Sequence, residues 1–176
     1  DIWSLIIDKQ NLSTQINQNI GNARIYGVSI DGKAKLFSGF NIMGNINLTD
    51  NTINKKIGQI PSILPLYGNL RINYKSKKFN LTLSNNFSGR KLSKDYSGGG
   101  EDKIEETPII NNEKGNIMYY GSPKWSIYSI SAALDHNENV RTSFSIENIF
   151  DLHYKEFASA ISSPGRAIIL NLNVKF

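Results

Sequence analysis

The sequence contains no cysteine and no long apolar run. A membrane-spanning helix needs roughly 18 or more consecutive apolar residues, and no stretch of the 176 residues approaches that length. If the chain meets lipid, it must do so as a closed β-barrel, since only helices and closed barrels satisfy their backbone polar groups there. The absence of cysteine is compatible with an oxidising compartment, although it excludes nothing by itself.

Chemistry-bearing groups are equally scarce. The two histidines, His136 and His153, lie apart in the chain, so we expect no shared metal site and no cofactor. Serine, histidine and aspartate show no arrangement that predicts a hydrolytic triad, and the sequence does not indicate an enzyme. The net charge is +5, but no basic stripe is interleaved with aromatics, which argues against nucleic acid as a partner.

What the sequence has in abundance is alternation. In the first such segment, Tyr26, Val28 and Ile30 are apolar, whereas Ser29 and Asp31 between them are polar. A strand directs successive side chains to opposite faces, so this period of two predicts strands with one apolar face. The pattern covers residues 26–36, 40–49, 69–75, 79–88, 128–134, 140–147 and 168–176. No amphipathic helix competes with it, and the chain is therefore predicted to be all-β.

The lengths of the connections favour a membrane barrel over a soluble β-sandwich. Tight turns are predicted at Ser38-Gly39, Lys75–Lys78 and Asp135–Asn139, and long polar segments at roughly 8–22, 50–65, 90–122 and 150–164. Short and long connections alternate, which places all long loops at one end of the sheet, as in outer-membrane barrels. Several strands also reach the length of about ten residues that a tilted strand needs to cross a bilayer.

The two ends of the chain support the same interpretation. The last alternating strand ends on an aromatic residue, Phe176, and we expect Ile168, Leu170 and Leu172 to face lipid with it. No signal peptide opens the chain at Asp1, and Ile2–Ile7 already has the character of a strand. We therefore expect a piece of a longer exported protein, located in the cell outer membrane.

The residues around the last two strands carry a resemblance to a known family. Asn148, Phe150 and Asp151 end the penultimate predicted strand, Tyr154 follows, and Pro164-Gly165-Arg166 precede the last strand. This set resembles the closing motif of TonB-dependent outer-membrane receptors. Residues 19–28, and Ile60-Pro61 with Pro65, are similar to further features of that family. Ser29 is a departure, because many members have glutamate there.

The resemblance implies a transmembrane antiparallel up-and-down barrel of about twenty-two strands. Residues 1–176 would supply about the last eight strands, with a plug domain expected upstream. It also implies uptake of a siderophore, haem, cobalamin or glycan, powered through TonB, which would contact the missing upstream part. Further implied partners are outer-membrane lipid, lipopolysaccharide and the barrel-assembly machinery, for which Phe176 resembles the recognition signal. The alternatives are a receptor-like barrel acting as a structural subunit of a larger complex, an outer-membrane enzyme, and a soluble binding module.

Elementary chemistry agrees with the motif. Pro164 has no backbone donor for a strand ladder and belongs before the strand, Gly165 permits a turn, and Arg166 suits a headgroup or an acidic partner. Asn148 and Asp151 are expected to hydrogen-bond nearby backbone and end a strand.

The long segment 90–122 is the best local candidate for ligand contact. Arg90, Lys91 and Lys94 would offer positive charge to an anionic ligand. We expect its acidic residues to be solvated rather than to bind calcium; these are Asp95, Glu101, Asp102, Glu105 and Glu106. Aromatic residues at the loop end are expected to form an interfacial belt, with ligand stacking as the alternative; these are Tyr119, Tyr120, Trp125 and Tyr128.

Overall fold

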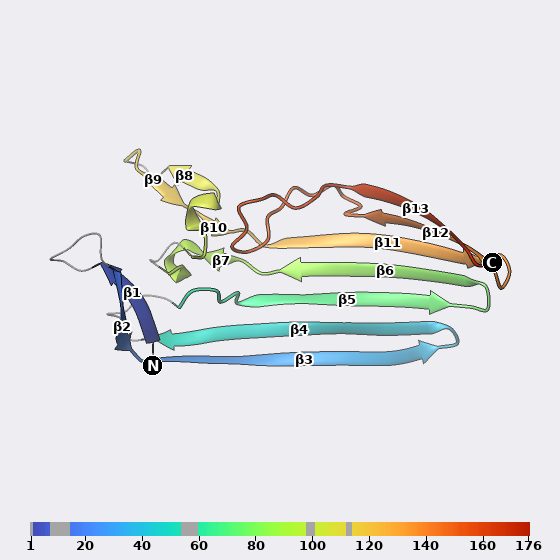
Figure 1. The fold of residues 1–176 in the computed structure, drawn as a ribbon, viewed down its shortest axis with the longest axis horizontal. Helices are drawn as coiled ribbons and strands as arrows, with labels where there is room; N and C mark the ends of the chain where they lie inside the picture. Colours follow the sequence, from blue (N-terminus) through green and yellow to red (C-terminus); the bar gives the residue numbers. More distant parts are fainter. Residues whose placement is uncertain (1, 8–14, 54–59, 98–100, 112–113) are drawn as a thin grey trace.

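A seven-stranded antiparallel sheet dominates the computed structural model, which describes residues 2–7, 15–53, 60–97, 101–111 and 114–176 (Figure 1). Its strands are β3 (Ala23–Phe37), β4 (Phe40–Ile53), β5 (Leu66–Lys75), β6 (Phe79–Ser88), β11 (Trp125–Asp135), β12 (Val140–Glu147) and β13 (Ala167–Val174). Within the sheet each strand pairs with the strand that precedes or follows it in this order. The up-and-down topology predicted from the alternating segments is therefore confirmed.

Connections are sorted by length between the two ends of the sheet. Tight turns join β3 to β4, β5 to β6 and β11 to β12 at the right of Figure 1, and the long connections lie at the left. The turns are held by their own residues and by contacts with the neighbouring strand. Gly39 adopts a φ of +83° and its carbonyl accepts the Lys75 N–H, while the Asn137 side chain accepts the Asn139 and Val140 N–H groups.

Two of the long segments contain more structure than the sequence predicted. In segment 8–22, β2 (Gln15–Gly21) forms a hairpin with β1 (Ile2–Ile7) and leads into β3. Segment 90–122 contains paired short strands and two single 3-10 turns. These are β7 (Lys91–Leu92) with β10 (Gly121–Ser122), β8 (Ile109–Asn111) with β9 (Ile117–Tyr119), η1 (Ser93–Asp95) and η2 (Ile104–Glu106). Such short pairings carry no period that sequence could show.

The register gathers the apolar side chains on one face of the sheet. Val28 lies opposite Leu48, Ile30 opposite Ile46, and Leu83 opposite Ile130. No other layer of the described part of the chain packs against this face. Among all the described residues, the only buried hydrophobic side chains are Ile63, Tyr96 and Ile127. A single layer without a core on either side needs an apolar medium against its apolar face, which a bilayer supplies. Among the described residues, no helix is long and apolar enough to cross a membrane.

The last strand ends earlier than predicted. β13 pairs with β12 up to Val174, which lies opposite Val140. On the far side of Val140, the neighbouring strand β12 gives way to its turn. The Lys175 backbone N–H therefore makes one further hydrogen bond, to the Asn139 carbonyl, and the Phe176 side chain is fully exposed. The expected outward series of Ile168, Leu170 and Leu172 is exposed on the apolar face.

Candidate functional site: the loop end of the sheet

A buried ion pair lies at the loop end of the sheet. The Lys91 ammonium is 2.7 Å from the Asp102 carboxylate, and their side chains are 2% and 1% exposed. The second Asp102 oxygen accepts the Ser62 backbone N–H at 2.6 Å. Asp102 therefore ties the loop after β4 to the long loop after β6, and both of its oxygens have a donor.

Aromatic rings surround the same ammonium and bring in a third loop. The Lys91 nitrogen lies 4.4 Å from the centre of the Phe157 ring and 4.9 Å from that of Tyr96. The two rings meet edge to face with centroids 6.0 Å apart. Since Phe157 belongs to the connection between β12 and β13, the ammonium joins three external loops. Cation–π contacts of this kind gain strength where water is excluded.

Tyr96 extends the cluster to β10. Its hydroxyl and the Ser122 hydroxyl are 2.7 Å apart. Burial raises the pKa of the Tyr96 phenol, with a smaller push in the same direction from the Asp102 carboxylate, and the hydrogen bonds with Ser122 oppose this rise. The phenol therefore keeps its proton at neutral pH. We call Ser62, Lys91, Tyr96, Asp102 and Phe157 the loop cluster.

Two sequence-based expectations change here. The acidic residues of segment 90–122 were expected to be solvated, but Asp102 is buried in the loop cluster and Glu106 pairs with Lys155 at 3.0 Å. Lys91 was expected to offer its charge to a ligand, but its ammonium is enclosed and already neutralised. Three consecutive glycines, Gly98, Gly99 and Gly100, separate Asp95 from Glu101 in the sequence and lie outside the described residues.

The other two candidate cations remain accessible. Arg90 is exposed and its guanidinium lies 3.9 Å from the centre of the Tyr120 ring. Lys94 is exposed as well. Their contact with a ligand stays a prediction.

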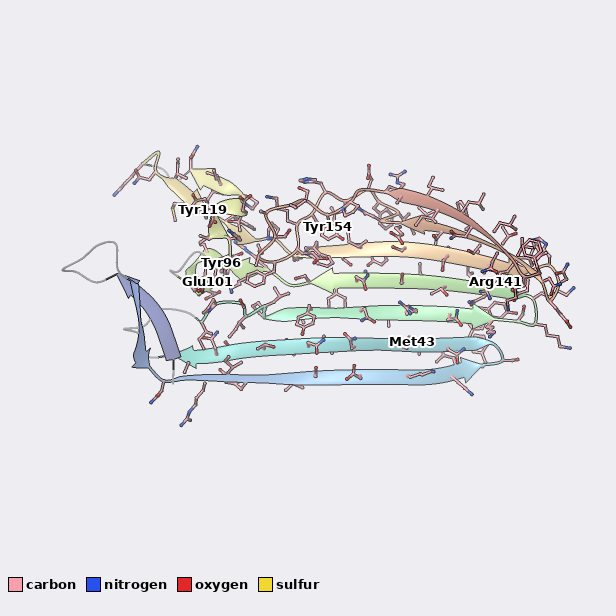
Figure 2. The ribbon with its side chains drawn as sticks, in the orientation of Figure 1. Met43, Tyr96, Glu101, Tyr119, Arg141 and Tyr154 are labelled. Carbon is pink, nitrogen blue, oxygen red and sulfur yellow. The ribbon has the colours of Figure 1, made fainter. Side chains whose placement is uncertain are left out.

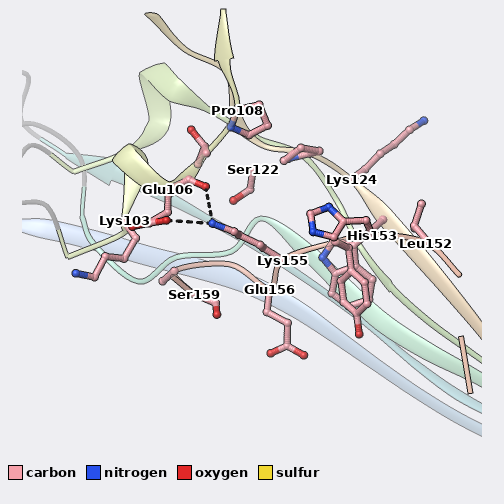
Figure 3. A pocket seen from close by; sticks show the side chains of 15 residues that line it. Lys103, Glu106, Pro108, Ser122, Lys124, Leu152, His153, Lys155, Glu156 and Ser159 are labelled. Atoms are coloured by element: carbon pink, nitrogen blue, oxygen red, sulfur yellow. Dashed lines mark hydrogen bonds and ion pairs between the residues drawn. The ribbon is translucent and has the colours of Figure 1, made fainter. Parts of the chain in front are cut away.

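A pocket of roughly 450 Å³ opens beside the loop cluster, between η2, the start of β11 and the last long loop (Figure 3). The rings of Trp125 and Tyr154 form an aromatic wall with centroids 4.7 Å apart. On another side, the Lys155 ammonium donates to the Glu106 carboxylate at 3.0 Å and to the Glu106 carbonyl at 3.3 Å. The pocket thus combines flat apolar surface with a charged edge. No group of His, Cys, Asp and Glu suited to a metal ion occurs among the residues that the structure describes.

The closing motif forms a compact turn at the same end. Asn148 is buried at a φ of +49°. Its side-chain amide donates to the carbonyls of Leu152 (3.0 Å) and Pro164 (3.3 Å), and its side-chain oxygen accepts the Leu152 N–H at 2.9 Å. One side chain therefore joins the end of β12 to the residues before β13.

Asp151 makes the second connection within the motif. Its carboxylate accepts the Arg166 backbone N–H at 2.7 Å. A Cβ atom on Gly165 would lie 2.7 Å from that same oxygen, so a larger residue here would push the Asp151 carboxylate away from the Arg166 N–H. Phe150 meets Tyr128 edge to face with centroids 5.6 Å apart. Asn148 and Asp151 thus contact Pro164, Gly165 and Arg166, and they join the end of β12 to the start of the last strand. The other two motif residues, Phe150 and Tyr154, contact rings of β11.

Sequence reasoning missed Ser62, Phe157 and Ser122. Ser62 contributes a backbone N–H at a φ of +62°, Phe157 a ring, and Ser122 a hydroxyl. None of these residues carries a local signal, because each matters only through a partner that is far away in the sequence.

The fold and the loop end together define a class of protein: a wall segment of an outer-membrane β-barrel with elaborated external loops. Comparisons with known proteins specify the family. Residues 1–149 match the family described as "TonB dependent receptor-like, beta-barrel", and the chain belongs to this family. A comparison with curated proteins gives no match.

Solved structures show the same fold. The copper transporter OprC matches with a TM-score of 0.69 and 15% identity over 93% of this chain and 25% of that one. The ferric enterobactin receptor PfeA of Pseudomonas aeruginosa matches at 0.66 and 14%, over 92% and 24%. The FrpB iron transporter of Neisseria meningitidis matches at 0.69 and 13%, over 98% and 27%. The chain spans about a quarter of these proteins, and the likeness concerns the barrel fold.

Proposed function

We propose that the chain is the C-terminal part of the barrel of a TonB-dependent receptor that takes up a scarce nutrient across the outer membrane. Family membership over residues 1–149 carries this proposal. The sorting of loops supports it, since the tight turns at one end leave the other end free for elaborate external loops. A plug domain and the contact with TonB belong, in this proposal, to the part upstream of Asp1.

The names of the structural neighbours indicate the range of nutrients. They include a copper transporter, a ferric enterobactin receptor and a ferripyoverdine receptor. One neighbour is the complex of FpvAI with pyocin S2. We infer a transported nutrient rather than a chemical substrate, because these neighbours are transporters and receptors.

First contact with the nutrient is proposed at the loop end. The pocket beside Trp125 and Tyr154 offers an aromatic wall. Arg90 and Lys94 are exposed at the same end of the sheet, in the long connection after β6. The loop cluster joins the long loop to its two neighbours, and in this proposal it preforms the pocket. Preformed pockets avoid the cost of ordering a loop on binding.

Outer-membrane lipid, lipopolysaccharide and the barrel-assembly machinery complete the proposed partners. Within the part of the chain that the structure describes, the side chains of the apolar face are left exposed, and lipid would bury them. Phe176, fully exposed at the end of the last strand, is proposed as the residue that the assembly machinery recognises.

The test is uptake in living cells. A strain lacking the full-length gene should lose growth on a limiting nutrient, and the loss should be reproduced by removing TonB. Equal growth of the deleted and parental strains across limiting iron, copper, cobalamin and glycan sources would refute an uptake function. A retained barrel with no TonB-dependent growth would favour the structural-subunit alternative.

A further inference from the structure

A group of cationic side chains lies on the polar face of the sheet, near its turn end. Lys33 is opposite Met43, which is opposite Arg71, so these residues share one face. Lys35 lies two residues beyond Lys33, and Lys75 four residues beyond Arg71, which keeps them on the same face. All four cationic side chains are exposed. We call Lys33, Lys35, Arg71 and Lys75 the basic band.

The charge of the basic band is not balanced within the described part of the chain. None of its four members forms an ion pair there. Apart from the basic band, the described residues on the same face of β3, β4 and β5 include one charged residue, Asp31. Elsewhere on the polar face, Arg141 (labelled in Figure 2) forms an ion pair with Asp135 at 3.5 Å. The basic band is therefore a local excess of positive charge.

The polar face is the inner face of the barrel wall. The opposite face carries the apolar side chains and meets lipid, so Lys33 and its neighbours line the interior. Between the charged residues stand amides, and a shallow depression there is lined by Asp31, Lys33, Met43, Asn45 and Asn69. Charges of one sign in front of a low-dielectric wall raise the local concentration of counter-ions.

We infer that the basic band is an anion-attracting surface and that the solute taken up by the receptor is negatively charged. This inference rests on the proposed function and narrows its substrate class. The alternative to an anionic solute is an acidic surface of another part of the receptor, which would lie inside the barrel against the basic band. In that case the band would hold the interior domain rather than guide a solute.

The electrostatic potential at the band is measurable with one engineered thiol. The present chain has no cysteine, and Met43 lies between Lys33 and Arg71 (Figure 2). Met43→Cys in the full-length receptor would be reacted with two methanethiosulfonate reagents, one bearing a sulfonate and one a trimethylammonium. The ratio of their rates, divided by the ratio for a free thiol, reports the sign of the local potential.

The expected ratio favours the sulfonate reagent by roughly tenfold at low salt and declines with ionic strength. Lys33→Gln with Arg71→Gln should bring it close to the free-thiol value. The control variant, Lys77→Gln with Lys78→Gln, removes the same amount of charge from the exposed turn between β5 and β6. It should leave the ratio of the two reaction rates unchanged.

A ratio equal to that of the free thiol, or insensitive to Lys33→Gln with Arg71→Gln, would overturn the inference. Faster reaction of the ammonium reagent, or no reaction with either, would also overturn it and favour an acidic interior domain over the band. These rates do not require TonB or transport. Failure of the uptake proposal would therefore be visible separately.

Discussion

Breaking the buried Lys91–Asp102 pair should release the external loops while leaving the barrel wall intact. In Asp102→Asn, Lys91 loses its carboxylate partner in a site where the Lys91 side chain is 2% exposed. Removal of one partner from a buried ion pair costs about 3–5 kcal/mol, because an uncompensated charge stays buried. The rings of Tyr96 and Phe157 offset a small part of this cost.

The matched control is an exposed pair in the same loop. Lys103 and Glu105 are 4.0 Å apart and 48% and 46% exposed. Glu105→Gln should change loop stability by less than about 1 kcal/mol, as is usual for surface pairs. Replacement of both buried partners, in Lys91→Met with Asp102→Leu, should recover much of the loss, since no unpaired charge then remains.

Hydrogen exchange of the loop amides measures the effect directly. A loss of about 3–5 kcal/mol corresponds to an increase in the opening equilibrium of between about 10² and several 10³-fold. The increase should appear at the Ser62 amide and around Tyr96, but not in β11 or β12. Unchanged exchange in Asp102→Asn, or an equal change in Glu105→Gln, would refute the role of the loop cluster.

Three further predictions concern packing, the closing turn and pH. A Cβ on Gly68 would overlap the Asn45 backbone carbonyl and meet the Phe87 ring at 2.7 Å, whereas one on Gly32 would meet nothing within 4 Å. Gly68→Ala should therefore cost about 1–3 kcal/mol and lower the temperature at which the folded band is lost on detergent gels, and Gly32→Ala should not. Asn148→Ala removes three hydrogen bonds at a residue with a positive φ and should lower the folding stability by about 2–4 kcal/mol. The measurement is the amount of folded barrel in the membrane, which should fall less in Asn148→Asp. The pKa of Tyr96 is raised in the folded state, so the protonated phenol stabilises the folded loops fully below pH ~10, and this stabilisation is lost as the pH rises through the folded pKa. Proteolysis of the loops should therefore increase in that alkaline range. An identical alkaline increase in Tyr96→Phe would contradict this assignment.

The strands and turns of the sheet could be predicted because their causes are local. Alternation at Tyr26, Val28 and Ile30 fixes which face of a strand is apolar, and Gly39 and the Asn137 side chain make tight turns from nearby residues. The predicted end of β13 was wrong by two residues, because the true end depends on where the neighbouring strand β12 turns. That point is set by pairing with Val140, not by the sequence near Phe176.

The loop end could not be predicted in the same way. Lys91 and Asp102 look like ordinary charged loop residues, and their burial depends on Ser62 and Phe157 from two other loops. The closing motif could be predicted only in part. Family resemblance identified Asn148, Asp151 and Gly165, but the close approach of the Asp151 oxygen to Gly165 is revealed only by the folded chain.

Labelling of single cysteines on intact cells tests the central claim most directly. Lys94 is exposed at the loop end and Lys77 in a tight turn at the opposite end. A membrane-impermeant maleimide should label Lys94→Cys on intact cells, and Lys77→Cys only after the outer membrane is permeabilised. Labelling of Lys77→Cys on intact cells, or protection of Lys94→Cys, would contradict an outer-membrane barrel wall with its long loops outside.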